Sequence, residues 1–117
     1  MAEDTSPLLK RKCQACSGDT PPLSKEKIQA YLTQLSGWEL SKEGKELIKN
    51  FKLKNFQAVL DFVNKIGAIA EEEDHHPNLY IYEYKKLRVE LSTHAIGGLS
   101  ENDFILAAKI DAISPAS

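Results

Sequence analysis

All three histidines of this chain lie between residues 75 and 94, as the adjacent pair His75 and His76 and the separate His94. Imidazole has an unperturbed pKa of about 6.5, so it both donates and accepts protons near neutral pH. Histidine is scarce in this sequence, and its confinement to one window indicates a site of acid and base chemistry.

The residues around the histidines indicate how the rings could meet. The pair follows an acidic run, Glu71 to Asp74, and precedes Pro77, which disfavours helical backbone at the residue before it. Successive side chains of an extended segment point to opposite sides, so one ring of the pair can enter a pocket while the other lines its wall. His94 ends a predicted hairpin whose antiparallel return would bring it back beside the segment that begins the hairpin.

Other roles for these histidines have to be weighed against a catalytic site. Each one alone could be a solvated loop residue, and the prediction depends on their grouping with Ser92, Thr93 and the glycines at 97 and 98. A zinc site is a further alternative, because three histidines and the carboxylates of the acidic run would supply enough ligands. Adjacent histidines rarely share one ion, and the sequence has no H-x-H or H-x-x-x-H spacing, so no metal is expected.

A structural role alone explains some of the carboxylates near the histidines better than others. Asp103 follows Ser100 at the spacing of a capping box, with a carboxylate in place of the usual Glu or Gln. We therefore expect Asp103 chiefly to cap a helix and to support the site only indirectly. The acidic run, by contrast, lies at a predicted helix C-terminus, where negative charge is unfavourable, and this conflict favours a functional role.

Length and composition predict a single soluble domain. The chain has 117 residues and a mass of 13.1 kDa, with 42% hydrophobic and 27% charged residues. Its net charge of −2 favours neither nucleic acid nor an anionic membrane as a partner. No apolar run approaches the roughly 20 residues that span a bilayer, and the N-terminus lacks the apolar region of a secretory signal, so we expect a cytoplasmic protein.

The two ends of the chain are predicted to lie outside the domain. Residues 1–22 are expected to form a flexible tail, residues 23–113 the domain, and residues 114–117 a short C-terminal tail. The N-terminal tail carries one C-x-x-C pair, Cys13 and Cys16. A lone pair lacks the four ligands of a structural zinc site, and this segment does not resemble a strand-to-helix redox junction. We expect reduced thiols, with metal binding or a disulfide as alternatives.

Hydrophobic periodicity predicts three helices and two hairpins. Ser24, Asn55 and Ser100 are the expected N-caps. The apolar face of the second helix, over 56–72, is expected to comprise Phe56, Val59, Leu60, Val63, Ile66 and Ala70. The hairpins are expected within 38–53 and 79–93, with Leu87, Val89, Leu91 and Thr93 on one face. The order is α-β-β-α-β-β-α, an α+β fold with a four-stranded antiparallel sheet covered by helices on one face.

The motif residues resemble those of the pterin-4a-carbinolamine dehydratases. The resemblance covers about residues 23–113 and passes through Glu71, His75-His76-Pro77, Tyr84, His94, Gly98-Leu99-Ser100 and the helix that begins near Asp103. It implies an enzyme that removes water from 4a-hydroxytetrahydropterin, the form released by aromatic amino-acid hydroxylases, to give quinonoid dihydropterin. It also implies that no cofactor is needed and that the chain forms a homodimer or homotetramer.

The resemblance also implies roles for individual residues. By motif position, His75 and His94 are the acid catalysts and His76 orients the pterin. Pterin-contacting positions also include Asp74, Pro77, Ser92, Thr93 and Ala95, and the supporting positions are Glu71 and Asp103. The chemistry suits imidazole, because the 4a-hydroxyl must be protonated to leave and the ring nitrogens must lose a proton afterwards.

The second hairpin departs from the pattern of many relatives by one extra residue, near Tyr82 to Lys85. A register slip there would turn every later side chain to the other face and point His94 away from His75. A turn insertion or a bulge would avoid this change.

A function of another class remains as the alternative prediction. A module of the same fold could bind pterin without turnover, or act as a protein partner of a hydroxylase or a transcription factor. The sequence gives no reason to expect nucleic acid or a membrane as the partner of this chain itself.

Overall fold

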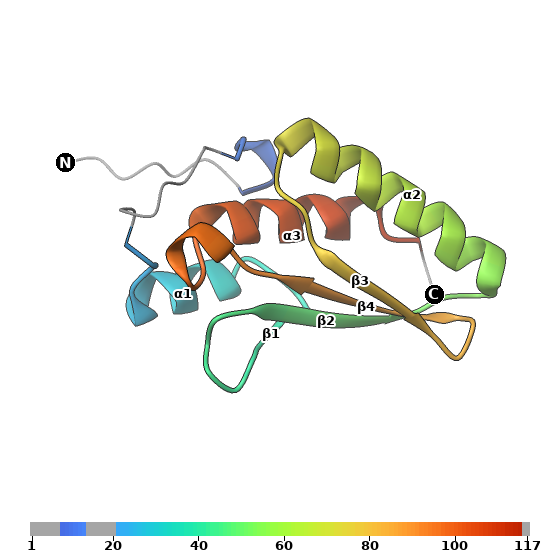
Figure 1. Cartoon of the computed structure of the whole chain (residues 1–117), viewed down its shortest axis with the longest axis horizontal. Coiled ribbons are helices and arrows are strands. Elements are labelled where there is room, and N and C mark those ends of the chain that lie inside the picture. The colour runs from blue at the N-terminus through green and yellow to red at the C-terminus, as the bar shows by residue number, and fades with distance from the viewer. Residues whose placement is uncertain (1–7, 14–20, 116–117) are drawn as a thin grey trace.

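The computed structural model describes residues 8–13 and 21–115, in which three α-helices lie on one side of a four-stranded sheet (Figure 1). In chain order the elements are η1 (Leu8–Lys10), α1 (Lys25–Leu32), β1 (Glu39–Leu40), β2 (Leu47–Lys52), α2 (Phe56–Glu73), β3 (Asn78–Tyr82), β4 (Lys86–Leu91), η2 (His94–Ile96) and α3 (Glu101–Ile113). This arrangement confirms the predicted α+β class and the α-β-β-α-β-β-α order of the main elements.

Pairing between the two hairpins builds the sheet. All three strand contacts are antiparallel, and the spatial order is β1-β2-β4-β3. The register pairs Leu47 with Leu91 and Phe51 with Leu87. Because side chains alternate along a strand, this register turns Leu47, Leu87, Val89 and Leu91 into the core, where each is fully buried. The start of β2 and the end of β4 therefore lie side by side at one end of the sheet.

The predicted caps are present at all three helices. The side chains of Ser24, Asn55 and Ser100 accept hydrogen bonds from backbone N–H groups in the first turns of α1, α2 and α3. The capping box of Ser100 and Asp103 is complete in both directions. These local bonds satisfy donors that the first turn of a helix would otherwise leave unpaired.

The buried stripe of α2 differs in part from the prediction. Its members are Val59, Phe62, Ile66, Ala70 and Glu73, at intervals of three and four residues. The prediction of Phe56 as a core residue is wrong, because its side chain is 47% exposed at the first position of the helix, whereas Phe62 is 1% exposed. Intervals of three and four keep side chains on one face, and that face passes through position 62 rather than 56.

The turn of the second hairpin takes up the extra residue of this hairpin, and the pairing of its strands does not slip. Tyr82 pairs with Lys86, so three residues form the turn, and Glu83 and Tyr84 have positive φ values of 46° and 50°. Leu79 pairs with Val89, and Thr93 is buried like the inward residues of β4. The alternation predicted for Leu87 to Thr93 is therefore confirmed.

Residues 8–13, which we name the N-terminal arm, pack against the domain, whereas the sequence predicts a flexible tail over 1–22. η1 lies next to α3, and Leu8 is 2% exposed within the core cluster. Two adjacent leucines, Leu8 and Leu9, form no periodic pattern from which this contact could be predicted. The second cysteine of the C-x-x-C pair, Cys16, lies outside the described residues, and Cys13 is a free cysteine.

A polar cluster joins the end of α3 to the sheet. Asp111 accepts a hydrogen bond from the indole nitrogen of Trp38 at 3.0 Å and an ion-paired hydrogen bond from Lys49 at 2.8 Å. The Lys49 ammonium also lies 4.8 Å from the ring centroid of Phe51. One carboxylate thus holds the segment before β1, the middle of β2 and the last helix together.

We predict that Asp111→Ala lowers the free energy of unfolding by about 1 to 3 kcal/mol, because the buried Trp38 indole loses its acceptor. Asp61→Ala is the matched control, because Asp61 is exposed and, among the described residues, accepts a hydrogen bond only from Gln57 on its own helix. Its effect should stay within about 0.5 kcal/mol. Urea unfolding followed by fluorescence measures both values, and equal effects would contradict the role given to Asp111.

Candidate active site

The buried carboxylate of Asp103 connects the segments that carry the predicted site. Its Oδ2 accepts hydrogen bonds from the Thr93 hydroxyl at 2.8 Å and from the Ser100 N–H at 3.0 Å. Its Oδ1 lies 2.6 Å from Nε2 of His75. The side chain of Asp103 is 0% exposed, and besides capping α3, as predicted, it contacts His75 directly.

The end of α2 determines where His75 lies. Asp74 adopts the left-handed conformation at φ 52° and ψ 42°, which Asp tolerates better than most residues. The chain then folds back so that the His75 N–H reaches the carbonyl of Ala70 at 3.1 Å, the long bond of a Schellman-type helix end. This ending places the ring of His75 against α3, where its side chain is only 11% exposed.

The neighbouring histidine lies in a different environment. His76 is 56% exposed, and its Nε2 is hydrogen-bonded to the carboxylate of Glu71, itself 77% exposed. The two adjacent rings thus differ in burial and in partner, as expected for side chains that leave the backbone on opposite sides. Glu71 bonds the exposed ring of the pair, and Asp103 bonds the buried one.

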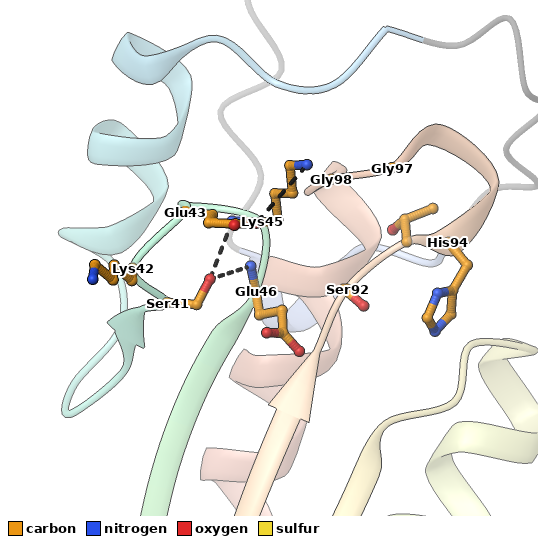
Figure 2. Close-up of a pocket in the computed structure, with 10 residues that line it drawn as sticks. Ser41, Lys42, Glu43, Lys45, Glu46, Ser92, His94, Gly97 and Gly98 are labelled. Atoms are coloured by element: carbon orange, nitrogen blue, oxygen red, sulfur yellow. Dashed lines mark hydrogen bonds and ion pairs between the residues drawn. The ribbon is translucent and has the colours of Figure 1, made fainter.

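A closed loop after β4 presents His94. Thr93 and Gly98 form an isolated antiparallel bridge, with the Thr93 N–H bonded to the Gly98 carbonyl at 2.9 Å. Gly97 closes η2 at φ 66°, a conformation that glycine adopts without strain. His94 is exposed at the start of η2, and in Figure 2 its ring projects toward the side on which the segment between α2 and β3 passes.

A cavity of about 530 Å³ opens next to this loop. One wall consists of residues 92–94, 97 and 98, and the other of residues 41–43, 45 and 46 from the β1–β2 connection. Figure 2 shows Ser41 and Glu46 on one side, with Ser92 and His94 on the other. The volume lies within the range of about 300 to 1,000 Å³ that is typical of small-molecule sites.

The structure brings together only part of the predicted site in this cavity. Ser92, Thr93 and His94 line it, whereas Asp74, His75, His76, Pro77 and Ala95 are not among its lining residues. His75 belongs instead to the adjoining Asp103 cluster, which the hydroxyl of Thr93 links to the cavity wall. The two imidazoles of His75 and His94 thus come from segments that Asp103 holds together.

The cavity wall formed by the β1–β2 connection is absent from the predicted site. The Ser41 hydroxyl accepts hydrogen bonds from the N–H groups of Lys45 and Glu46, at 3.2 and 3.1 Å, and so shapes this turn (Figure 2). The hairpin could be predicted from its turn residues. Its position beside residue 92 depends on the pairing of β2 with β4, for which the sequence carries no local signal.

A second buried carboxylate, Glu73, lies one residue before the left-handed turn. Lys109 Nζ donates to its Oε2 at 2.8 Å, and the N–H of Cys13 donates to its Oε1 at 2.8 Å. Burial alone would raise the pKa of Glu73, but these hydrogen bonds outweigh it and hold the pKa below its ordinary value of 4.5. Burial of the Cys13 thiol, and then the charge of Glu73, raise the pKa of Cys13 to about 12, so this thiol stays protonated at neutral pH.

Across residues 8–13 and 21–115, no three His, Cys, Asp or Glu side chains are grouped as ligands for a metal ion. In the same part of the chain, no helix combines the length and apolar character needed to cross a membrane.

The fold and the site define a small α+β domain with a histidine and carboxylate cluster next to a pocket at one end of the sheet. The model of the family described as pterin 4 alpha carbinolamine dehydratase matches residues 21–113. The chain belongs to this family, which confirms the resemblance found in the sequence.

Related proteins agree with this assignment. A protein of Nitrosospira multiformis, provisionally named a pterin-4-alpha-carbinolamine dehydratase, is 48% identical over 91% of this chain and 91% of its own length. One of the same provisional name from Rickettsia canadensis is 50% identical over 89% of this chain and 94% of its own.

Solved structures show the same fold. The crystal structure of a transcriptional coactivator/pterin dehydratase from Brucella melitensis matches with a TM-score of 0.76 and 30% identity, over 80% of this chain and 99% of that one. A pterin dehydratase-like protein identified as a RuBisCO assembly factor of the alpha-carboxysome matches with a TM-score of 0.59 and 23% identity, over 70% of this chain and 94% of that one. The second likeness concerns the fold alone.

We predict that Asp103→Ala lowers the free energy of unfolding by about 2 to 4 kcal/mol, because it removes a helix cap and leaves buried donors of Thr93 and Ser100 without an acceptor. Glu72→Ala, at an exposed position of α2, is the control and should change stability by no more than about 0.5 kcal/mol. Chemical unfolding at neutral pH measures both, and an Asp103 effect as small as that of Glu72 would refute the central role of this carboxylate.

The lowered pKa of Glu73 predicts a pH-dependent contribution to stability. A carboxyl whose pKa is lowered by folding stabilises the protein above its unfolded pKa, and this contribution disappears as the pH falls through the folded pKa. The stability advantage of the wild type over Glu73→Gln should therefore be constant near neutral pH and shrink on acidification below about pH 4.5. Urea midpoints of both proteins between neutral and acid pH measure it, and a difference that does not change with pH would contradict the ionised pair with Lys109.

Proposed function

We propose that this protein is a 4a-hydroxytetrahydropterin dehydratase that uses histidine acid and base catalysis. The proposal rests on family membership and on one observation in the structure: Asp103 binds His75 with one oxygen and, with the other, the Thr93 hydroxyl next to His94. That arrangement supplies two imidazoles from distant segments near one pocket. No cofactor enters the proposed reaction.

The proposed reaction needs one proton delivered and one removed. A protonated imidazole gives its proton to the hydroxyl on C4a, the C–O bond breaks, and water leaves. The lone pair of the adjacent ring nitrogen forms the new C=N bond, and a neutral imidazole takes the proton that the resulting cation must lose. Two positioned imidazoles can perform both transfers near neutral pH, with a gain of about 10² to 10⁴ in rate from each.

His75 and His94 are the acid and base pair of this proposal. The Asp103 carboxylate accepts from Nε2 of His75, which fixes the ring orientation and leaves Nδ1 to exchange a proton with the substrate. Exposed His94 reaches the pocket from the other segment.

His76, oriented by Glu71, positions the pterin, and Asp74, Pro77, Ser92, Thr93 and Ala95 complete the binding surface.

The oligomeric state and the cellular role of the protein belong to the same proposal. We propose a homodimer or homotetramer in the cytoplasm that recycles the pterin of an aromatic amino-acid hydroxylase. Edge strand β3 supports association, because its side chains Tyr80, Ile81 and Tyr82 are exposed large hydrophobics.

We predict that His94→Ala lowers kcat by about 10² to 10⁴ and leaves the fold intact, because His94 is exposed and its loss removes a proton-transfer group rather than packing. Stopped-flow absorbance with freshly generated 4a-carbinolamine measures turnover, and urea unfolding checks the fold. Glu72→Ala serves as the control with wild-type turnover. A His94→Ala variant that retains wild-type turnover would remove His94 from the mechanism, and a wild type that binds pterin without turnover would favour a non-catalytic module.

A further inference from the structure

We infer that the N-terminal arm, residues 8–13, is a strap that holds the C-terminal end of α2 and thereby positions His75. The arm precedes residue 21, where the match to the family model begins. For its effect on turnover the inference rests on the proposed function. Its effect on the geometry of His75 can be measured independently of any reaction.

The first end of the arm is anchored in the core. Leu8 is 2% exposed, whereas the adjacent Leu9 is 48% exposed. Arg11 donates to the carboxylate of Glu101 at 2.5 Å and to the Tyr31 hydroxyl at 3.3 Å, and its side chain is mostly buried. One apolar contact and one ion pair thus attach the arm to α3 and α1.

The other end of the arm reaches the end of α2. The N–H of Cys13 donates to Oε1 of Glu73 at 2.8 Å, and its thiol lies 3.6 Å from the carbonyl of Asn102. Glu73 is the last residue of α2, directly before the left-handed Asp74 that turns the chain to His75. The arm therefore binds the helix at the residue from which the turn to His75 begins.

The end of α2 is joined to α3 at two neighbouring points. Glu73 pairs with Lys109 at 2.8 Å, and His75 pairs with Asp103 at 2.6 Å. Lys109 and Asp103 belong to the same helix, so a change in the position of Glu73 relative to α3 also changes the position of His75 relative to Asp103. The arm acts on the first of these two contacts.

Burial explains why Glu73 needs the arm. A carboxylate removed from water is stable only when its oxygens accept hydrogen bonds. Lys109 satisfies one oxygen and the Cys13 N–H satisfies the other. Without the arm one oxygen of Glu73 would have to be hydrated, and Glu73 would be held to α3 by Lys109 alone. The acids of this turn already oppose the helix dipole.

The experiment compares Leu8→Ala with Leu9→Ala in the full-length chain. Leu8→Ala removes the anchor, and Leu9→Ala is the matched control at an exposed neighbouring position. Release of the arm is measured as the initial rate of tryptic cleavage after Lys12, identified by mass spectrometry. The position of His75 is measured by the downfield proton resonance of its hydrogen-bonded imidazole, and turnover is measured by the stopped-flow assay.

Leu8→Ala should raise cleavage after Lys12 about tenfold or more, broaden the His75 imidazole proton and lower kcat about three- to tenfold with little change in KM. Leu9→Ala should behave as the wild type in all three measurements. Arg11→Met, with exposed Lys10→Met as its control, removes the ion pair of the arm with Glu101, leaves Leu8 in place and should reproduce the result if Leu8→Ala folds poorly.

The inference is overturned if cleavage rises while the His75 resonance and kcat remain at the values of the control. It is also overturned if neither Leu8→Ala nor Arg11→Met raises cleavage, because the arm would then not be anchored as the structure indicates. If the wild type shows no turnover, the proposed function fails, and the His75 resonance alone decides whether the arm positions the ring.

Discussion

The carboxylate of Asp103 is the interaction on which the site depends. A fully buried acid is tolerated only when both of its oxygens are bonded, and here the donors come from three separate segments: Ser100 at the start of α3, Thr93 after β4 and His75 after α2. The domain cannot bury Asp103 without bringing these segments together. Folding of the last helix and assembly of the site are therefore one event, because the same side chain completes both.

The position of Asp103 within α3 explains how one residue performs both tasks. As the third residue of the helix, it can return one oxygen to the backbone of its own cap while the other points out of the helix end. His75 thus receives an oriented partner whose own geometry is fixed by backbone bonds, as a histidine used in proton transfer requires.

The sequence predicts those features that depend on neighbours within a few residues. The caps at Ser24, Asn55 and Ser100 and the inward alternation of β4 belong to this group. Features that depend on distant partners could not be predicted in this way. The pairing of β2 with β4, which supplies the second wall of the cavity, has no local signature, and neither does the docking of Leu8 on a helix about a hundred residues away. Phe56 was expected in the core because periodicity alone does not fix the rotation of a helix, whereas packing against the sheet does.

The end of α2 shows how an unfavourable local sequence can mark a site. Consecutive acids at a helix C-terminus oppose the dipole, and nothing within the helix compensates them. Three of the four acids take part in contacts or turns that involve the histidines: Glu71 bonds exposed His76, Glu73 is buried against Lys109 and the arm, and Asp74 adopts the left-handed conformation that directs His75 inward. Each compensation either engages a histidine directly or fixes the backbone that carries one. The contacts that offset the acids at this helix end therefore also help to place the histidines, which couples the local conflict in the sequence to the geometry of the site.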